Sequence, residues 1–167
     1  SRHVSGERAD IDRLTAGRDD FVFYSLFEWQ DRKGPRELLH AYFSAFPEQG
    51  DTLLLLKINP AAAGVAAVLI EEVRRETGSS ARVHVAAEPW TPAQIEALHA
   101  RGDCYVSLHR GEGWGYPLFD AAAHGVPAIA TACSGPLDYL AADAAYLVPY
   151  DLGPVRQAYA YYAPHMK

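Results

Sequence analysis

Two carboxylates stand in a glycine-rich stretch, RGEGWGYPLFDAAAHG, which occupies residues 110–125 of the 167-residue chain. Glu112 lies between two glycines, and Asp120 follows eight positions later. Glycines allow the backbone to approach a ligand closely, and the free N–H groups at the start of a helix attract phosphate. Because a carboxylate repels phosphate, its natural partners in such a site are sugar hydroxyls, which donate hydrogen bonds. The stretch therefore predicts a ligand with a central phosphate and hydroxyls on both sides, such as a nucleotide-sugar.

The segments around this stretch alternate between strand-like and helix-like patterns. Strand patterns occupy six segments, at residues 21–27, 52–58, 82–87, 104–109, 127–132 and 145–150. Helix patterns lie between them, at residues 38–46 and 65–73, from 91 onward, and at 117–124. This alternation predicts an α/β domain with a Rossmann-like doubly wound parallel sheet of about six strands.

Two helices carry more detailed expectations. The sequence TPAQ at residues 91–94 has the form of a capping box, in which Thr91 and Gln94 satisfy each other's backbone N–H groups. In the helix at 65–73, the apolar periodicity favours a buried face, and Gly78 is expected to end the helix. The apolar residues that mark this face are Val65, Val68, Leu69 and Val73.

Ligands of doubly wound sheets bind beyond the carboxyl ends of the strands. The segment HRGEGWGYP follows the fourth predicted strand, and CSGPLD follows the fifth. Because these strands are expected to be neighbours, both loops should line one crevice. Gly111, Gly113 and Gly115 are then expected to bring the backbone close to the ligand.

Composition restricts the class of protein. The formal net charge of −6 argues against a nucleic-acid partner. Cys104 and Cys133 lie far apart in apolar surroundings, which is typical of buried thiols in a reduced cytosolic protein. The longest apolar stretch, AAAGVAAVLI, is about half as long as a bilayer span. We therefore expect one cytoplasmic domain at residues 20–167, preceded by a polar lead-in or linker at residues 1–19.

The stretch EGWGYPLFD resembles the E-x7-E motif, typically written EGFGLPxLE, of retaining GT-B glycosyltransferases of family 4. The longer run SLHRGEGWGYPLFDAAAHGVPAIATACSGPLDYL is similar to a run in one branch of that family, and RKG at residues 32–34 resembles its lysine-glycine turn. The resemblance covers about residues 20–150. It implies the carboxyl-terminal, donor-binding domain of an enzyme that transfers a hexose from a nucleotide diphosphate to an acceptor hydroxyl, without a metal or other cofactor.

The resemblance also implies a role for each matched residue. Glu112 is expected to act at the catalytic centre and hold the donor sugar's hydroxyls, Asp120 to bind the ribose, and Lys33 to neutralise the diphosphate. The loop AAEPW at residues 86–90 is expected to lie near the nucleotide base. The remaining donor-binding candidates are Arg32, His109, Arg110, Gly113, Trp114, Gly115 and Tyr116. For His109 and Arg110, a packed histidine and a surface arginine remain open alternatives.

Two departures from the family pattern concern donor affinity. Asp120 stands where the family has Glu, so its carboxylate is about 1.5 Å closer to the backbone. The arginine that many members carry shortly before the lysine is absent, because those positions read LFEWQD. Arg32 can compensate, although adjacent side chains usually point apart.

Other functions remain as alternatives. The two departures from the family pattern favour a non-catalytic nucleotide-sugar-binding or scaffold module. A related GT-B epimerase is a further hypothesis. A dinucleotide oxidoreductase needs G-x-G-x-x-G after its first strand, where this chain has EWQDRKG. A metal-dependent transferase needs Asp-x-Asp after a strand, and the DID at residues 10–12 precedes every predicted strand.

The resemblance finally implies a larger enzyme. We expect an amino-terminal acceptor domain to be missing and the carboxyl-terminal helices to be truncated, so that the chain alone transfers no sugar. The isolated domain is expected to expose an apolar face and self-associate. The full-length enzyme is expected to associate peripherally with membranes.

Overall fold

The computed structural model describes residues 20–141 and 143–154. The predicted lead-in at 1–19 lies outside the described residues, as do residues 155–167, which bear on the expected truncation. The strands are β1 (Phe21–Leu26), β2 (Thr52–Lys57), β3 (Arg82–Ala86), β4 (Cys104–Ser107), β5 (Ala128–Thr131) and β6 (Ala145–Val148). The helices are α2 (Pro35–Ala45), α3 (Ala63–Thr77), α4 (Pro92–Arg101) and α5 (Tyr116–Ala123), with short 3₁₀ turns η1 (Asp31–Lys33), η2 (Pro60–Ala62) and η3 (Gly135–Asp138).

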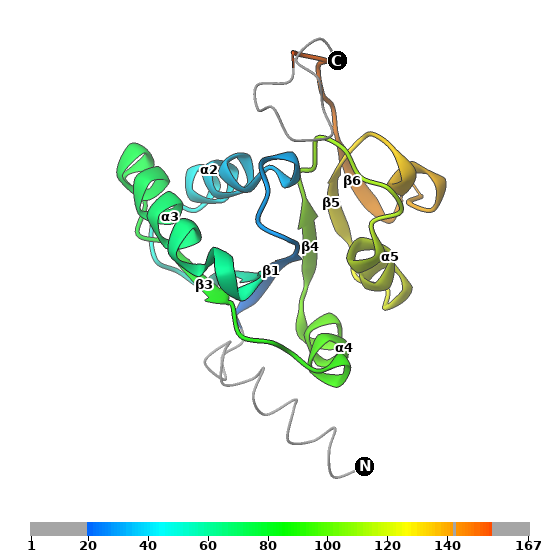
Figure 1. Ribbon diagram of the computed structural model, residues 1–167, viewed down its shortest axis with the longest axis horizontal. Helices are drawn as coiled ribbons and strands as arrows, with labels where there is room; N and C mark the ends of the chain where they lie inside the picture. The colour runs from blue at the N-terminus through cyan, green and yellow to red at the C-terminus, as the bar shows by residue number, and fades with distance from the viewer. Residues whose placement is uncertain (1–19, 142, 155–167) are drawn as a thin grey trace.

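The six strands form one sheet in the order β3-β2-β1-β4-β5-β6, and every pair is parallel. Helices α2 and α3 cover one face of the sheet, and α4 and α5 cover the other (Figure 1). This arrangement confirms the predicted Rossmann-like fold. The strand order reverses between β1 and β4, so a ligand crevice is expected where the loops after these two strands separate.

Local sequence patterns explain several elements. Strand β2 is a continuous apolar run because it is buried on both faces, and its four leucines are all at most 6% exposed. The capping box of α4 is present, with the Gln94 N–H donating to Thr91 Oγ1 and the Thr91 N–H donating to Gln94 Oε1. Gly78 ends α3 in the left-handed conformation, as expected. Cys104 is buried, as predicted, and its burial raises the pKa of the thiol to about 11.

The prediction for α3 was partly wrong. Its buried residues are Ala66, Ile70 and Val73, whereas Val65 and Val68 are 62% and 67% exposed. Positions 66, 70 and 73 share one face of a helix with 3.6 residues per turn, and Val68 lies about 200° away from Ile70. Because the first half of α3 is apolar all around, its periodicity did not determine which face meets the sheet.

Candidate functional site

Two loops come together beyond the carboxyl ends of β1 and β4. The backbone N–H of Arg110 donates to the carbonyl of Arg32 at 2.7 Å, and Arg32 Nη1 donates to the Gly111 carbonyl at 3.2 Å. Gly34 has φ +64°, and a Cβ atom there would lie 2.1 Å from the Leu108 carbonyl oxygen. The glycine of the RKG turn therefore permits the close approach of the two loops.

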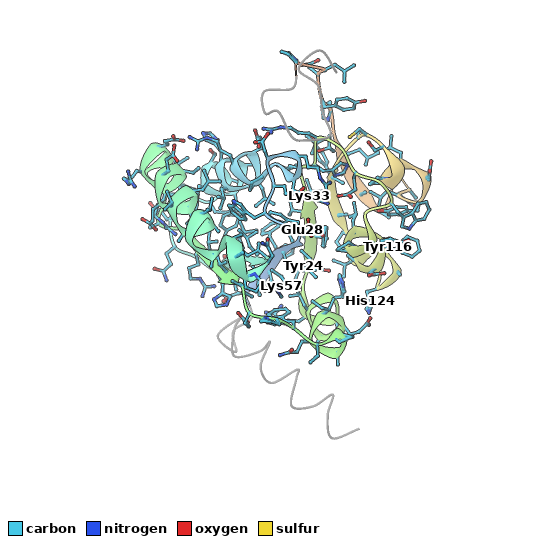
Figure 2. The ribbon with its side chains drawn as sticks, in the orientation of Figure 1. Tyr24, Glu28, Lys33, Lys57, Tyr116 and His124 are labelled. Atoms are coloured by element: carbon cyan, nitrogen blue, oxygen red, sulfur yellow. The ribbon has the colours of Figure 1, made fainter. Side chains whose placement is uncertain are left out.

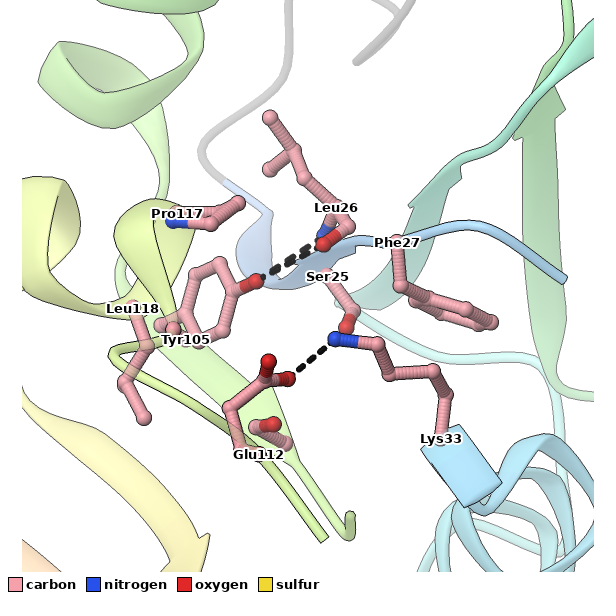
Figure 3. Close-up of a pocket in the computed structure, with 10 residues that line it drawn as sticks. Ser25, Leu26, Phe27, Lys33, Tyr105, Glu112, Pro117 and Leu118 are labelled. Carbon is pink, nitrogen blue, oxygen red and sulfur yellow. Dashed lines mark hydrogen bonds and ion pairs between the residues drawn. The ribbon is translucent and has the colours of Figure 1, made fainter. Parts of the chain in front are cut away.

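A small pocket lies where these loops meet, with room for little more than a water molecule. Its walls come from the end of β1, from η1, from β4 and from the start of α5, and Lys33 and Glu112 face each other across it (Figure 3). The lining residues are Ser25, Leu26, Phe27, Lys33, Tyr105, Ser107, Glu112, Gly115, Pro117 and Leu118.

Lys33 and Glu112 form an ion pair in this pocket between Nζ and Oε2. Their side chains are only 14% and 13% exposed, so solvent screens the pair less than a surface pair. Arg32 Nη1 lies 3.8 Å from the other carboxylate oxygen. Adjacent side chains usually point apart, but Arg32 and Lys33 both leave the tight η1 turn and reach the same carboxylate, as compensation by Arg32 requires.

Arg110 is directed away from this pocket. Its guanidinium pairs with Asp31 and Glu37, and Nη1 also donates to the Asp31 carbonyl at 3.1 Å. The side chain is 47% exposed, which agrees with the surface-arginine alternative. These contacts join the start of the glycine-rich loop to η1 and α2, so Arg110 holds the two loops in place.

His109 is packed inside the domain and is 1% exposed. Its Nδ1 lies 3.0 Å from Ser107 Oγ, and its Nε2 lies 3.3 Å from the Cys133 carbonyl oxygen. Burial lowers the pKa of the ring. The packed-histidine alternative therefore describes its position, and the ring joins the end of β4 to the loop after β5.

The loop after β5 packs against the glycine-rich loop, as expected. A Cβ atom at Gly135 would lie 2.0 Å from the Gly113 carbonyl oxygen, and Tyr139 Oη donates to the Trp114 carbonyl at 3.0 Å. Burial and the Glu112 carboxylate raise the pKa of Tyr139 to about 12, so its hydroxyl keeps the proton that it donates. The described pocket is nevertheless lined from the β1 and β4 sides, without a residue of CSGPLD.

The start of α5 combines a left-handed glycine turn with exposed aromatic rings. Gly115 has φ +73°, and a Cβ atom there would lie 3.0 Å from Glu112 Cγ. Gly111 and Gly113 have open space instead, so a close approach to a ligand is sterically free at both. Trp114 is 40% exposed, and Tyr116 is 71% exposed and projects from α5 (Figure 2).

Asp120 and the loop at 86–90 lie outside this pocket. Asp120 is exposed on α5, one turn after Tyr116. In the other segment, Trp90 Nε1 donates to Glu88 Oε1 at 2.6 Å, and the Lys57 ammonium lies 5.6 Å from the ring centre of Trp90. The structure thus brings Lys33, Arg32 and Glu112 together and leaves these segments on the surrounding surface.

The sequence analysis missed several pocket residues. Ser25 is the last residue but one of β1, Ser107 ends the neighbouring β4, and Tyr105 Oη donates to the Leu26 carbonyl at 3.0 Å. Serines at the carboxyl ends of otherwise apolar strands are the signal that could have identified the first two. Within residues 20–141 and 143–154, no group of three or more metal-ligating side chains is present, and no helix is long and apolar enough to cross a membrane.

Comparisons with known proteins agree with the observed fold. The family model described as "Glycosyl transferases group 1" matches residues 18–160. Among curated proteins, no significant match was found. A crystal structure of Anabaena HepE in complex with UDP and glucose has a TM-score of 0.65 at 15% identity, covering 81% of this chain and 36% of that chain.

Two further structures extend the comparison. The carboxyl-terminal domain of a glycosyl transferase group 1 family protein, LpcC from Francisella tularensis, has a TM-score of 0.62 at 19% identity and covers 83% of this chain and 73% of that chain. The catalytic domain of a cholesterol-alpha-glucosyltransferase from Helicobacter pylori has a TM-score of 0.59 at 14% identity, with 76% of each chain covered. The chain therefore shares its fold with these proteins and spans about a third of HepE.

Proposed function

The chain belongs to the glycosyl transferases group 1 family, and on this premise we propose that it is the donor-binding domain of a retaining, family 4 GT-B glycosyltransferase. The whole enzyme transfers a hexose from a nucleotide diphosphate to an acceptor hydroxyl on glycans or glycoconjugates. The observation that carries the proposal is the Lys33–Glu112 pair in a pocket at the switch point of the sheet. It places a cation for phosphate beside a carboxylate for hydroxyls.

The charges at this site suit sugar transfer. Departure of the diphosphate places negative charge on its oxygens, and Lys33, with Arg32 nearby, stabilises that charge. Glu112 accepts hydrogen bonds from the sugar's hydroxyls and so fixes the sugar relative to the leaving group. Because Lys33 and the amino end of α5 supply the charge stabilisation, we propose that the reaction needs no divalent metal.

The surrounding residues hold the rest of the donor. Asp120, exposed on α5, accepts hydrogen bonds from the ribose, and the loop at 86–90 lies beside the base. The backbone of residues 113–116 faces the diphosphate. Arg110 positions the loops that carry Lys33 and Glu112 and does not bind the donor itself. An acceptor domain, a cytoplasmic location and peripheral membrane association of the whole enzyme belong to the same proposal.

A titration of the purified chain with a panel of nucleoside diphosphates and nucleotide-sugars tests the proposal. We expect one nucleotide and its sugar derivative to bind by calorimetry, with the same affinity in EDTA. Glu112→Gln should weaken binding of the nucleotide-sugar more than binding of the bare nucleotide, whereas Asp120→Ala should weaken binding of both ligands alike. Binding that disappears in EDTA and returns with magnesium would contradict the metal-free mechanism, and failure of the whole panel would contradict the proposed function.

A non-catalytic nucleotide-sugar-binding or scaffold module is the second candidate. It is favoured by the shorter second acid, Asp120, which lies outside the pocket, and by the absence of a family arginine before η1. Both candidates predict donor binding. Only the enzyme is expected to transfer sugar, so an assay of glycosyl transfer by the full-length protein distinguishes the two candidates. Transfer would support the enzyme, and binding without transfer would support the module.

A further inference from the structure

Ser107 and His109 form a hydrogen-bonded unit at the wall of the pocket. Ser107 ends β4 and lines the same pocket as Lys33 and Glu112. His109 lies behind it, 1% exposed, with Nδ1 3.0 Å from Ser107 Oγ and Nε2 3.3 Å from the Cys133 carbonyl oxygen. The unit therefore connects a pocket hydroxyl to a backbone group of another strand's loop.

The Cys133 carbonyl determines which ring nitrogen of His109 carries the proton. A carbonyl oxygen can only accept a hydrogen bond, so Nε2 must donate and must be protonated. A neutral imidazole has one donor and one acceptor, which leaves Nδ1 as the acceptor. Burial is the largest influence on the pKa of His109 and lowers it, which favours the neutral ring. The backbone groups of Cys133 and Ser107 and the Glu112 carboxylate raise this pKa, and Lys33 lowers it further, so the net direction is downward.

The hydroxyl of Ser107 then also has a fixed hydrogen-bonding role. It has one proton, and this proton is donated to Nδ1 of His109. The oxygen of Ser107 can therefore only accept further hydrogen bonds. Phosphate oxygens also only accept, so Ser107 has no hydrogen bond to offer them. A sugar hydroxyl can donate, and it finds a second acceptor in Glu112 in the same pocket.

We propose that Ser107 is a specificity-determining residue whose oxygen accepts a hydrogen bond from a hydroxyl of the donor sugar, and that His109 is the positioning residue that fixes this polarity. The proposal rests on the proposed function and adds an assignment of two side chains within it. Ser107 then distinguishes the nucleotide-sugar from the bare nucleotide diphosphate, because only the former brings a hydrogen-bond donor into this part of the pocket.

The first experiment reads the proton position directly. Long-range ¹H–¹⁵N NMR on the histidine-labelled chain at neutral pH should show His109 with a protonated Nε2 and an unprotonated Nδ1. This measurement requires no ligand. The opposite tautomer, with the proton on Nδ1, would overturn the proposal even if a nucleotide-sugar binds.

The second experiment compares affinities by calorimetry, using the nucleotide-sugar of the panel that binds most tightly and its nucleoside diphosphate. Ser107→Ala should lower the affinity for the nucleotide-sugar by about 3- to 10-fold and change the affinity for the diphosphate by less than about 2-fold. The matched control is Ser44→Ala, which removes a hydroxyl whose Oγ lies 3.4 Å from His40 Nδ1 on the exposed face of α2. It should change neither affinity. Equal losses for both ligands in Ser107→Ala would overturn the proposal.

The third experiment uses two variants to test the positioning role of His109. In His109→Gln, the side-chain amide can donate to the Cys133 carbonyl and its oxygen can accept from Ser107, so discrimination between the two ligands should persist. In His109→Leu, Ser107 loses its acceptor and discrimination should fall as in Ser107→Ala. If the leucine variant does not fold, His109→Gln decides, because a glutamine variant that folds but loses discrimination would contradict the assigned polarity. If no ligand of the panel binds, the proposed function fails and this proposal fails with it.

Discussion

Ion pairs join separate chain segments at both ends of the parallel strands, but the surroundings of the pairs differ. The side of the sheet where the strands begin is called the amino edge, and the side where they end is called the carboxyl edge. At the amino edge, Arg82 at the start of β3 pairs with Asp20, just before β1, and the Asp20 side chain is 4% exposed. At the carboxyl edge, Lys33 pairs with Glu112, and both side chains line a pocket. The two pairs are similarly buried, so burial and opposite charge alone do not identify a binding site.

The carboxyl-edge pair is distinguished by what brings it together. Lys33 and Glu112 stand on two loops that a backbone hydrogen bond and the Gly34 contact hold against each other. The Arg82–Asp20 pair instead joins the starts of strands that the sheet already holds in register. A ligand can enter between loops, whereas it cannot separate strands. The amino-edge pair is therefore expected to contribute to stability, and the carboxyl-edge pair to binding.

The largest effect is expected for Gly34→Ala, which places a Cβ atom 2.1 Å from the Leu108 carbonyl oxygen at a left-handed φ. The free energy of unfolding should fall by roughly 3–5 kcal/mol, measured by urea denaturation with circular dichroism. The control is Gly78→Ala, which has a similar φ but no neighbouring atom within 4 Å, and should cost roughly 1–2 kcal/mol. Equal costs at the two positions would show that the loops do not depend on this close approach.

Arg82→Met tests the amino edge. It leaves the buried Asp20 carboxylate without its cation, so the free energy of unfolding should fall by about 2–4 kcal/mol. The variant's affinity for the nucleotide-sugar should stay unchanged wherever the chain is folded. The double variant Arg82→Met, Asp20→Leu removes both charges and should recover part of the stability. A lower ligand affinity in the folded single variant would contradict the separation of roles between the edges.

Lys33→Met tests the carboxyl edge. Loss of the cation should weaken nucleoside diphosphate binding by about 1–3 kcal/mol, which calorimetry can measure. The control is Arg36→Met on α2, whose exposed guanidinium pairs with Glu72 and Glu76 on α3. This second variant should bind the ligand like the unmodified chain. If both variants lose the same amount of affinity for the nucleoside diphosphate, Lys33 acts through the overall charge of the domain and not through its position in the pocket.

The smallest effect concerns pH, because histidines with opposite pKa shifts change the free energy of unfolding in opposite directions. Burial lowers the pKa values of His109 and His99, so their contribution to stability is present above about pH 6.5 and is lost as the pH falls below it. Hydrogen bonds to the Asp120 carbonyl and to Glu96 raise the pKa of His124, at the end of α5. Its contribution is present below about pH 6.5 and is lost as the pH rises.

Urea denaturation between about pH 5 and pH 8 checks both signs. His109→Gln should reduce the loss of stability on the acid side, leaving the part due to His99. His124→Gln should reduce the loss on the alkaline side. An acid-side loss that is unchanged in His109→Gln would mean that the buried ring gains its proton equally easily in the folded and unfolded states.

The fold could be predicted from the sequence because its evidence is local. The continuous leucine run of β2, the capping box at Thr91 and the glycine at position 78 each determine structure within a few residues. The buried face of α3 was predicted only in part, because Val65 and Val68 satisfy a helical period as well as Ala66 does. Small and large apolar residues on all sides of a helix leave the choice to tertiary packing.

The site could be predicted less completely, because its details depend on contacts between distant segments. The glycine-rich stretch and the RKG turn pointed to Glu112 and Lys33, which the structure places in contact. The Ser107–His109 unit depends on the carbonyl of Cys133, which comes from another strand's loop. No local pattern specifies that position. The assigned roles of Asp120 and the loop at 86–90 stay predictions.

Under the proposed function, the Lys33–Glu112 pair affects which ligands can bind between the two loops. A ligand that offers only an anion takes Lys33 away from Glu112 and leaves the carboxylate without a partner. Free phosphate and bare nucleotides are such ligands, whereas a nucleotide-sugar supplies an anion to the lysine and hydroxyls to the carboxylate together. If the proposed enzyme transfers the sugar, the remaining nucleotide must compete again with Glu112 for the same lysine. Under that proposal, the pair is expected to favour release of the spent nucleotide and to limit inhibition by product.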